Sequence, residues 1–233
     1  MIYEHTMTAT FLSRPNRFLA HVLLDGQEVV CHVKNTGRLG ELLLPGAAVW
    51  VQEHDNPNRK TRFSLIAVEK DGVCYNIDSQ APNILAREWL ASGKAFPGSR
   101  ITDIHPEQKY GNSRFDLAFC QDGKRAFMEV KGVTLNQNGT GLFPDAPTLR
   151  GVKHVRELIE CQKEDYEAYV LFVVKFETAE RFMPNIARQP EFAAALLDAR
   201  NAGVHVMAAR CSVQPEQVEI VTEIPVELPE STE

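Results

Sequence analysis

The stretch from Ser113 to Thr134 constrains the fold most, because it predicts two strands joined by a tight turn. Asp122-Gly123 lies at its centre, and this dipeptide is typical of the two-residue type I′ turn, which needs positive φ at both positions. The register set by this turn places Asp116 directly opposite Glu129. Facing Cβ atoms in an antiparallel pair are about 4.5–5.5 Å apart. The stretch therefore predicts two neighbouring carboxylates on one hairpin.

A third charged side chain falls on the same face of this hairpin. Residues two apart in a strand share a face, so Lys131 joins Glu129 and Asp116. Two carboxylates this close repel each other unless a proton or a cation lies between them. Asp116, Glu129 and Lys131 therefore predict a divalent-metal site, and the alternative is that they are solvated charges on a surface hairpin. Glu107 lies a few residues upstream as a further candidate acid, or as a surface acid after a proline.

Six ordered segments make the chain similar to the sugar fermentation stimulation protein (SfsA) family. Within them, Asp116 followed by Glu129-Val130-Lys131 matches the D…ExK signature of PD-(D/E)xK nucleases. The segments are NTGRLGELLLPG (35–46), NPNRKTRF (56–63), APNILA (81–86), YGNSRFDL (110–117), MEVKGVTL (128–135) and FPDAPTLRGVKHVREL (143–158). The resemblance implies an N-terminal OB-like small β barrel followed by a restriction-endonuclease-like α/β domain with a mixed central sheet. It also implies sequence-independent DNA binding and a role in expressing sugar-utilisation genes.

The residues themselves favour the same two-domain organisation. Five strand-like runs with turn signals between them predict a small β barrel, and an OB-like fold uses five strands. These runs are 18–24, 28–33, 47–54, 62–70 and 73–77. Asp78–Pro82 is a polar break, so we expect a barrel domain over 1–80 and an α/β domain over 81–233.

The second domain reads as helix, hairpin with a neighbouring strand, helix, strand, helix, strand. Asn83 is predicted to cap its first helix, and residues 99–112 are expected to be irregular. A loop of about a dozen residues is expected over 136–147, long enough to suspect a function. The uninterrupted apolar run 168–176 is typical of a central strand buried on both faces. This order predicts an α/β fold with a mixed sheet.

Phosphodiester hydrolysis needs charge neutralisation, an activated water and a stabilised leaving group. Asp116 and Glu129 are expected to hold Mg²⁺ or Mn²⁺, and the nucleases that the chain resembles commonly add the carbonyl of the Val130 position. Lys131 would orient or deprotonate the attacking water, or stabilise the developing charge. Arg150 and His154 are four apart at the start of a predicted helix, where they could reach a phosphate. On spacing alone His154 reads as an exposed helical histidine; the resemblance raises Asp145, Arg150 and His154 to site candidates.

Basic residues at or beside the turns of the predicted barrel invite a nucleic-acid interpretation. The alternative for each is a solvated loop side chain with no special role. These candidate phosphate contacts are Arg14, Arg17, Arg38, Arg59, Lys60 and Arg62. The formal net charge of −6 argues mildly against a nucleic-acid partner, since phosphate contacts come from Lys and Arg. We expect DNA as the partner, with RNA as a further option.

No run of about 18 apolar residues occurs, so no membrane span is expected, and no secretory signal is visible. The five cysteines are scattered without metal-site spacing, which indicates reduced thiols and a cytoplasmic protein. The oligomeric state stays open, with a homodimer as one option. Two functions compete: a DNA-binding protein that retains metal-dependent nuclease chemistry, and a non-catalytic DNA-binding transcriptional regulator. A small-ligand-binding barrel has no positive feature in the sequence.

Overall fold

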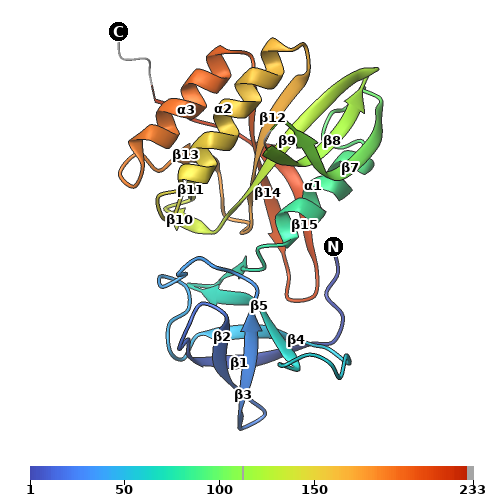
Figure 1. Cartoon of the computed structure of the whole chain (residues 1–233). Helices are drawn as coiled ribbons and strands as arrows, with labels where there is room; N and C mark the ends of the chain where they lie inside the picture. Colours follow the sequence, from blue (N-terminus) through green and yellow to red (C-terminus); the bar gives the residue numbers. More distant parts are fainter. Residues whose placement is uncertain (112, 230–233) are drawn as a thin grey trace. The chain divides into compact units, whose positions relative to one another are not determined.

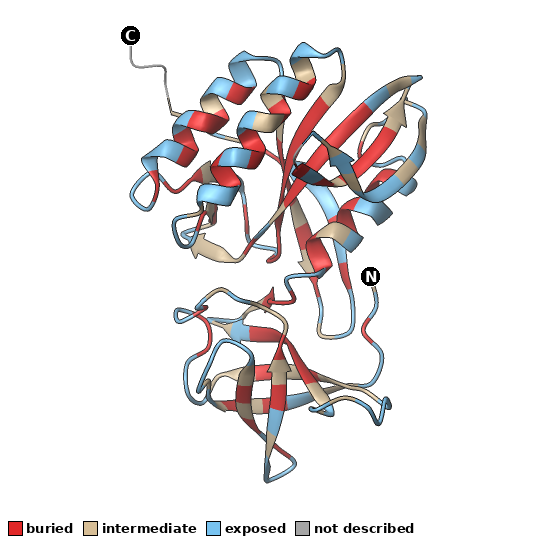
Figure 2. Cartoon of the chain, in the orientation of Figure 1, coloured by how far each residue is buried: buried red, intermediate tan, exposed pale blue. Residues whose placement is uncertain are grey.

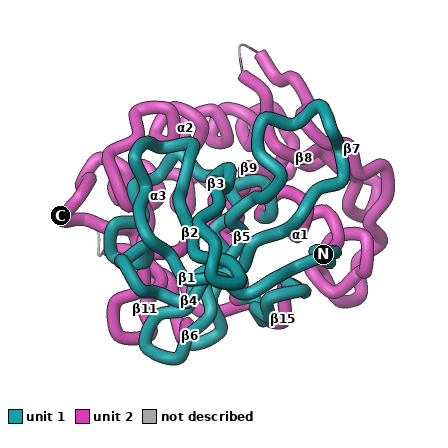
Figure 3. Tube along the Cα trace, turned by 90° about the horizontal axis from the view of Figure 1, so that it is seen from below, with its two compact units in different colours: residues 1–81, 175–178, 211–219 teal, residues 82–174, 179–210, 220–233 magenta. Residues whose placement is uncertain are grey.

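The computed structural model describes residues 1–111 and 113–229, which form two compact units (Figure 3). The first unit comprises Met1–Ala81 with two short later segments, Lys175–Thr178 and Cys211–Glu219. The second comprises Pro82–Val174, Ala179–Arg210 and the end of the described chain. The division into domains 1–80 and 81–233 stays a prediction, and the two later segments in the first unit are not foreseen by it.

The first unit is built on a closed five-stranded barrel, so the OB-like fold is confirmed. Strand β1 is antiparallel to β2 and β4, β2 pairs β3, and β5 closes the ring by pairing β4 and, in parallel, β3. A sixth strand, β6, adds to the edge of β5. The strands are β1 (Thr6–Ser13), β2 (Leu19–Leu24), β3 (Gln27–Val33), β4 (Ala48–Glu53), β5 (Phe63–Lys70) and β6 (Val73–Asn76).

The five strands expected from sequence omit β1 and count β6 in its place. Strand β1 alternates Thr6, Thr8 and Thr10 with less polar residues, which is a period-2 strand pattern of strand-favouring residues that the predicted set leaves out. The predicted Asp122-Gly123 turn is confirmed, because both residues have positive φ, and Asp25-Gly26 and Asp71-Gly72 form turns with the same property.

The second unit contains a six-stranded mixed sheet in the order β15-β14-β12-β9-β8-β7, so the expected α/β fold is confirmed. Strands β9, β12 and β14 run parallel, whereas β7, β8 and β9 are joined as antiparallel neighbours. The strands are β7 (Ile101–Tyr110), β8 (Ser113–Gln121), β9 (Lys124–Val133), β12 (Glu167–Val174), β14 (His205–Val213) and β15 (Val218–Ile224). Residues 168–174 of β12 are buried, as a central strand requires (Figure 2).

Helices α2 (Leu149–Lys163) and α3 (Pro190–Asn201) contact each other and lie side by side over this sheet (Figure 1). Helix α1 (Ala81–Ala91) leads into β7. A small second sheet consists of β10 (Leu135–Gln137), β11 (Thr140–Phe143) and β13 (Arg181–Pro184). No helix within the described residues has both the length and the apolar character to cross a membrane. All five cysteines are free thiols.

Three local predictions are wrong. Residues 99–112 were expected to be irregular, but most of them form β7, an edge strand whose exposed, polar sequence carries no apolar alternation. The expected loop over 136–147 begins with a hairpin, β10–β11, around the positive-φ pair Asn138-Gly139. Asn83 does not cap α1, because this helix already begins at Ala81.

Candidate metal centre and nucleic-acid surfaces

The two predicted carboxylates lie where the central hairpin stops pairing. The β8–β9 ladder runs from the turn to Leu117↔Met128, in the predicted register. Asp116 and Glu129 are the next residue on each strand, and they share the face opposite Leu117 and Met128. On its other side, β9 pairs with β12 from Ala126 to Val133, with Glu129 opposite Val170. The carboxylates therefore lie where β8 separates from β9, while β9 stays paired with β12.

At this point the Asp116 carboxylate, and not a backbone carbonyl, accepts the hydrogen bond of the Val130 N–H. The Val130 N–H donates to Asp116 Oδ2 at 2.8 Å, and Asn83 Nδ2 donates to Oδ1 at 2.8 Å. Burial, and then the charge of Glu129, raise the pKa of the Asp116 carboxyl, although both hydrogen bonds oppose the change. Asp116 and Glu129 are two carboxylates that are fixed close together and repel each other, and a bound cation would relieve this repulsion.

Glu129 is 2% exposed, and its two oxygens differ. Oε1 accepts hydrogen bonds from Lys131 Nζ and His154 Nδ1. Oε2 is buried and has no hydrogen-bond partner among the described residues. Burial alone would raise the pKa of the Glu129 carboxyl, but the His154 hydrogen bond and the Lys131 charge outweigh it and lower this pKa. Glu129 is therefore held as an anion with one buried oxygen available to a ligand.

His154 orients Glu129 through one ring nitrogen. Helix α2 begins after Thr148, whose Oγ1 accepts from Gly151 N at 2.9 Å, and this cap places Arg150 and His154 on adjacent turns. Arg150 Nε lies 3.4 Å from His154 Nε2. Since a guanidinium only donates, Nε2 must accept, which puts the ring proton on Nδ1 and makes His154 the donor to Glu129.

The donor set fits a hard divalent cation. Asp116 and Glu129 supply carboxylate oxygens, the buried Glu129 Oε2 lacks a partner, and the Val130 backbone lies beside both. Residues 1–111 and 113–229 contain no group of three or more His, Cys, Asp or Glu side chains that could hold a metal. Mg²⁺ commonly uses only one or two carboxylates, together with water and substrate phosphates, so two are sufficient.

The other predicted acids lie outside this pair. Glu107 is on β7 between the pairs Pro106↔Leu117 and Gln108↔Phe115, so its backbone is beside Asp116. Its exposed carboxylate instead accepts from Arg114 Nη1 at 3.1 Å. Asp145 is exposed in the loop before α2.

Asn83 contacts the site but is not among the predicted site residues. Within the APNILA segment its position is typical of a helix cap. Only the folded chain brings its amide to Asp116, across 33 sequence positions.

The predicted basic residues of the barrel fall into two groups, those with hydrogen bonds or ion pairs to other described residues within the barrel and those without. Arg14 donates at 2.7–2.8 Å to four carbonyls, those of Arg17, Asn35, Gly37 and Arg38, which joins two loops. Arg59 donates to Ser64 Oγ at 2.9 Å, and Arg62 pairs with Glu53. The exposed cations without such a bond are Arg17, Arg38 and Lys60.

A shallow groove of about 550 Å³ runs along β2 and β3 of the barrel. Its floor is apolar, and Lys60 and Arg62 stand at one side. The lining residues are Leu19, Val29, Val30, Lys60, Thr61, Arg62 and Phe63. OB folds bind oligonucleotides on this face, between the loops that follow the first and fourth strands. Arg17 belongs to the first of these loops and Lys60 to the second.

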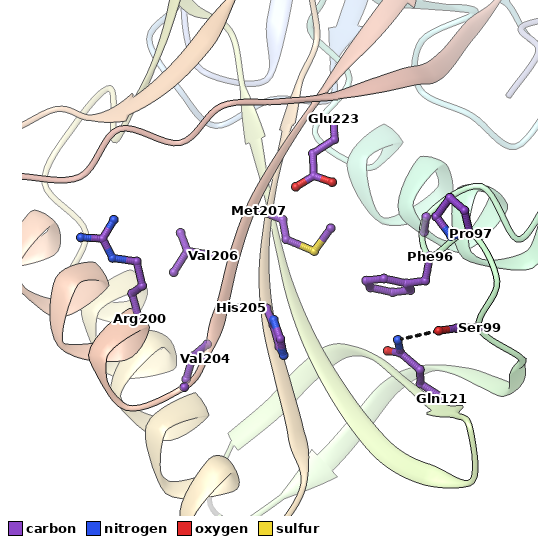
Figure 4. A pocket seen from close by; sticks show the side chains of 12 residues that line it. Phe96, Pro97, Ser99, Gln121, Arg200, Val204, His205, Val206, Met207 and Glu223 are labelled. Carbon is purple, nitrogen blue, oxygen red and sulfur yellow. Dashed lines mark hydrogen bonds between the residues drawn. The ribbon is translucent and has the colours of Figure 1, made fainter.

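A further cavity of about 670 Å³ in the second unit lies around the start of β14, and its β14 contacts other than Val206 face away from Glu129. His205 aligns with Tyr169, which aligns with Met128, the neighbour of Glu129 in the strand. Figure 4 shows His205 and Met207 on the side of Phe96, with Arg200 across β14. The lining of this cavity contains one Arg and one Glu, Arg200 and Glu223, so it has no excess of positive charge that would favour phosphate.

Comparison with known proteins agrees with this architecture over most of the chain. The family model described as the SfsA N-terminal OB domain matches residues 12–77, and the sugar fermentation stimulation protein RE domain matches residues 80–217. A sugar fermentation stimulation protein homolog of Clostridium beijerinckii is 49% identical over 220 residues, covering 94% of this chain and 96% of the relative. The Ruminiclostridium cellulolyticum homolog is 45% identical over 228 residues, covering 98% and 100%.

Among solved structures, SfsA from Pyrococcus furiosus in complex with Ca²⁺ superposes with a TM-score of 0.87. The two sequences are 27% identical, and the match covers 98% of each chain. Both family models and the full-length relatives agree, so this chain belongs to the SfsA family.

Proposed function

We propose that this protein binds DNA and hydrolyses phosphodiester bonds with a divalent cation held by Asp116 and Glu129, with the Val130 carbonyl as a further ligand. The buried, unpartnered Oε2 of Glu129 beside a second carboxylate carries this proposal. The Pyrococcus furiosus relative was solved in complex with Ca²⁺, an ion that takes oxygen ligands, and this supports a divalent-cation site in the present chain. Mg²⁺ and Mn²⁺ have the same preference for oxygen ligands, and we propose them as the working ions.

When bound, the cation would neutralise phosphate charge and lower the pKa of an attacking water. The chain's own residues prepare the site for this. Asn83 and the Val130 N–H fix both oxygens of Asp116, while His154 fixes Oε1 of Glu129. Lys131, two residues from Glu129 on the same face, supplies an ammonium that orients the water or stabilises the charge developing on the phosphate.

The barrel supplies the proposed sequence-independent DNA surface. Arg17, Arg38 and Lys60 are exposed in loops, and the apolar groove on β2 and β3 offers a surface for bases. Arg14, Arg59 and Arg62 are assigned a supporting role, because their guanidinium groups hold the loops. RNA is the alternative polymer for the same surface.

The experiment is incubation of the purified protein with single-stranded DNA, double-stranded DNA and RNA, each with Mg²⁺, Mn²⁺ or EDTA. The Glu129→Ala, Lys131→Ala double variant is compared with Glu160→Ala, Lys163→Ala, which removes an exposed Glu–Lys pair from α2. We expect metal-dependent cleavage by the wild type and the control but not by the site variant. Binding without cleavage under every condition would instead favour the non-catalytic regulator.

A further inference from the structure

A cavity of about 400 Å³ adjoins the candidate metal centre, because His154 both lines it and contacts Glu129. It is lined by Ser113, Arg114, Leu149, Arg150, Lys153 and His154. Three of these six side chains are cationic, and His154 also contacts Glu129. We call this cavity the cationic pocket. It lies entirely within the second unit.

The cations reach the cationic pocket from two elements. Arg114 is on β8, two residues before Asp116, so strand alternation puts both on one face of the sheet. Arg150 and Lys153 are three residues apart on α2 and therefore share a face of the helix. The pocket also lies at the first turns of this 15-residue helix, whose positive end adds to the field.

A fourth cation borders this group. Lys109 of β7 pairs directly with Arg114 of β8, so the two side chains share a face of the sheet. Like charges directly opposite in a strand pair are destabilising, and an anion between them removes the penalty. Glu107 partly meets this need through its contact with Arg114 at 3.1 Å.

The ion pairs that Arg114 and Lys153 make outside the pocket hold these side chains weakly. The Arg114–Glu107 pair is solvent-exposed on both sides, and exposed pairs contribute little to stability. Lys153 is itself exposed and reaches Glu157, whose side chain is only 21% exposed, at 3.6 Å, which is long for an ion pair. An incoming dianion or polymer phosphate could therefore recruit Arg114 and Lys153 at small cost. Guanidinium groups suit phosphate because their planar donors bind two of its oxygens at once.

We propose that the cationic pocket binds a phosphate of the nucleic-acid strand adjacent to the phosphodiester held at Asp116 and Glu129. This inference rests on the proposed function and adds Arg114 and Lys153 to the substrate-binding residues. The bound group is either an internal phosphate or a terminal phosphate monoester. The two sources share the same chemistry and differ in the substrate that reveals them.

The test is equilibrium binding of labelled oligonucleotides, with Ca²⁺ and separately with EDTA, over a range of salt concentrations. The Arg114→Ala, Lys153→Ala double variant is compared with Lys163→Ala, Arg188→Ala, which removes the same charge from exposed positions outside the pocket. Loss of one or two phosphate contacts lowers the salt slope by about 1 to 2 and weakens binding roughly tenfold or more at moderate salt. The control variant should bind like the wild type.

Substrate ends separate the two sources of phosphate. If the pocket holds an internal phosphate, the double variant loses affinity for linear and circular strands alike. If it holds a terminal phosphate, the loss is confined to strands with a 5′- or 3′-phosphate and is absent with hydroxyl ends. Glu107→Gln should act in the opposite direction and tighten binding severalfold, because it releases Arg114.

Unchanged affinity and salt slope for every substrate, or an equal loss in the control variant, would overturn the inference. The readout does not need cleavage. Loss of binding in a protein that never cleaves would refute the proposed hydrolysis and leave the pocket intact. Cleavage with unaltered binding by the double variant would do the reverse.

Discussion

Glu129 in the second unit and Lys175 in the first are both buried charged residues, but the groups around them differ. Lys175 is 1% exposed, and its Nζ donates to the Asp78 carbonyl at 2.8 Å. The buried Asp78 carboxylate offsets its charge and pairs with Lys34 at 3.3 Å. Glu129 has cationic and hydrogen-bonding partners too, Lys131 and His154, but both contact Oε1. It also lies beside a second carboxylate, and its Oε2 has no hydrogen-bond partner among the described residues.

This difference distinguishes a charge that stabilises the fold from one that can bind a ligand. A buried charge that is neutralised and hydrogen-bonded within the fold has a structural role. A buried charge that shares its site with a like charge, and has lone pairs left over, indicates a ligand that is still to come. By this criterion Lys175 is a structural residue, and Glu129 fits the role of cation ligand that we propose for it.

The largest expected effect separates the two lysines by function. Lys131→Met should lower metal-dependent cleavage about 100-fold to 10,000-fold, because it removes the ammonium beside Glu129. Lys175→Met should leave cleavage unchanged within a few fold. Initial rates on one DNA substrate measure both variants. Similar losses in the two would remove the distinction between a site lysine and a structural lysine.

Lys175 and Lys131 should also differ in their effect on stability, where Lys175 is the residue with the larger effect. Burial lowers the pKa of Lys175 to about 8 from an ordinary value of 10.5. Between these pH values the unfolded Lys175 binds more protons than the folded one, so its contribution to the free energy of unfolding should rise with pH, by up to roughly 3 kcal/mol. Burial also raises the pKa of the Cys31, Cys74, Cys161 and Cys211 thiols to about 12, which lowers the free energy of unfolding at alkaline pH in wild type and variants alike. The measurement is therefore the difference between wild type and Lys175→Met in urea unfolding at pH 7 and pH 10. This difference should change with pH in favour of the wild type, whereas the difference between wild type and Lys131→Met should not; a pH-independent difference for Lys175→Met contradicts the account.

His154 tests whether the orientation of Glu129 matters. His154→Ala removes the donor to Oε1 and should weaken Mn²⁺ binding about 10-fold to 100-fold, the usual cost of losing a residue that orients a metal ligand. His154→Asn places an amide N–H near the position of Nδ1 and should recover part of the affinity. Equal affinities of the two variants would assign His154 to packing alone.

Acidification should weaken metal binding, because a cation needs Asp116 ionised. The raised pKa of Asp116 means that this loss begins at a higher pH than for an ordinary aspartate. Asn83→Ala removes a hydrogen bond to the carboxylate and should shift the loss further toward neutral pH. Mn²⁺ titrations at a series of pH values measure the shift. A displacement toward acid would contradict the role given to Asn83.

The smallest effect belongs to the barrel. Arg38→Ala with Lys60→Ala should reduce the salt slope of DNA binding by about 1 to 2, since each removes at most one phosphate contact. Arg14→Ala should mainly lower stability, because its guanidinium joins four carbonyls. A slope that falls only with Arg14→Ala would move the DNA surface away from the free cations.

Much of this could be predicted from short-range rules. The Asp122-Gly123 turn fixed the hairpin register, and the register with strand alternation placed Asp116, Glu129 and Lys131 on one face. What failed depends on partners distant in sequence. The β7 strand exists because β8 pairs with it, although its own residues are polar and exposed.

Asn83 and Lys175 show the same limit in single residues. Asn83 looks like a helix cap until the fold brings it to Asp116. Lys175 reads as part of an apolar strand, and its counter-charge, Asp78, is 97 positions away. Neither partner leaves a local trace in the sequence.

The most direct test of the central claim is calorimetric titration of Mn²⁺ into the wild type, Asp116→Asn, Glu129→Gln and, as control, Glu160→Gln. We predict a divalent-cation site in the wild type and the control that is lost, or weakened at least 100-fold, in both site variants. Both substitutions preserve side-chain size, and circular dichroism would verify that each variant is folded. Equal Mn²⁺ affinity in all four proteins would contradict the account.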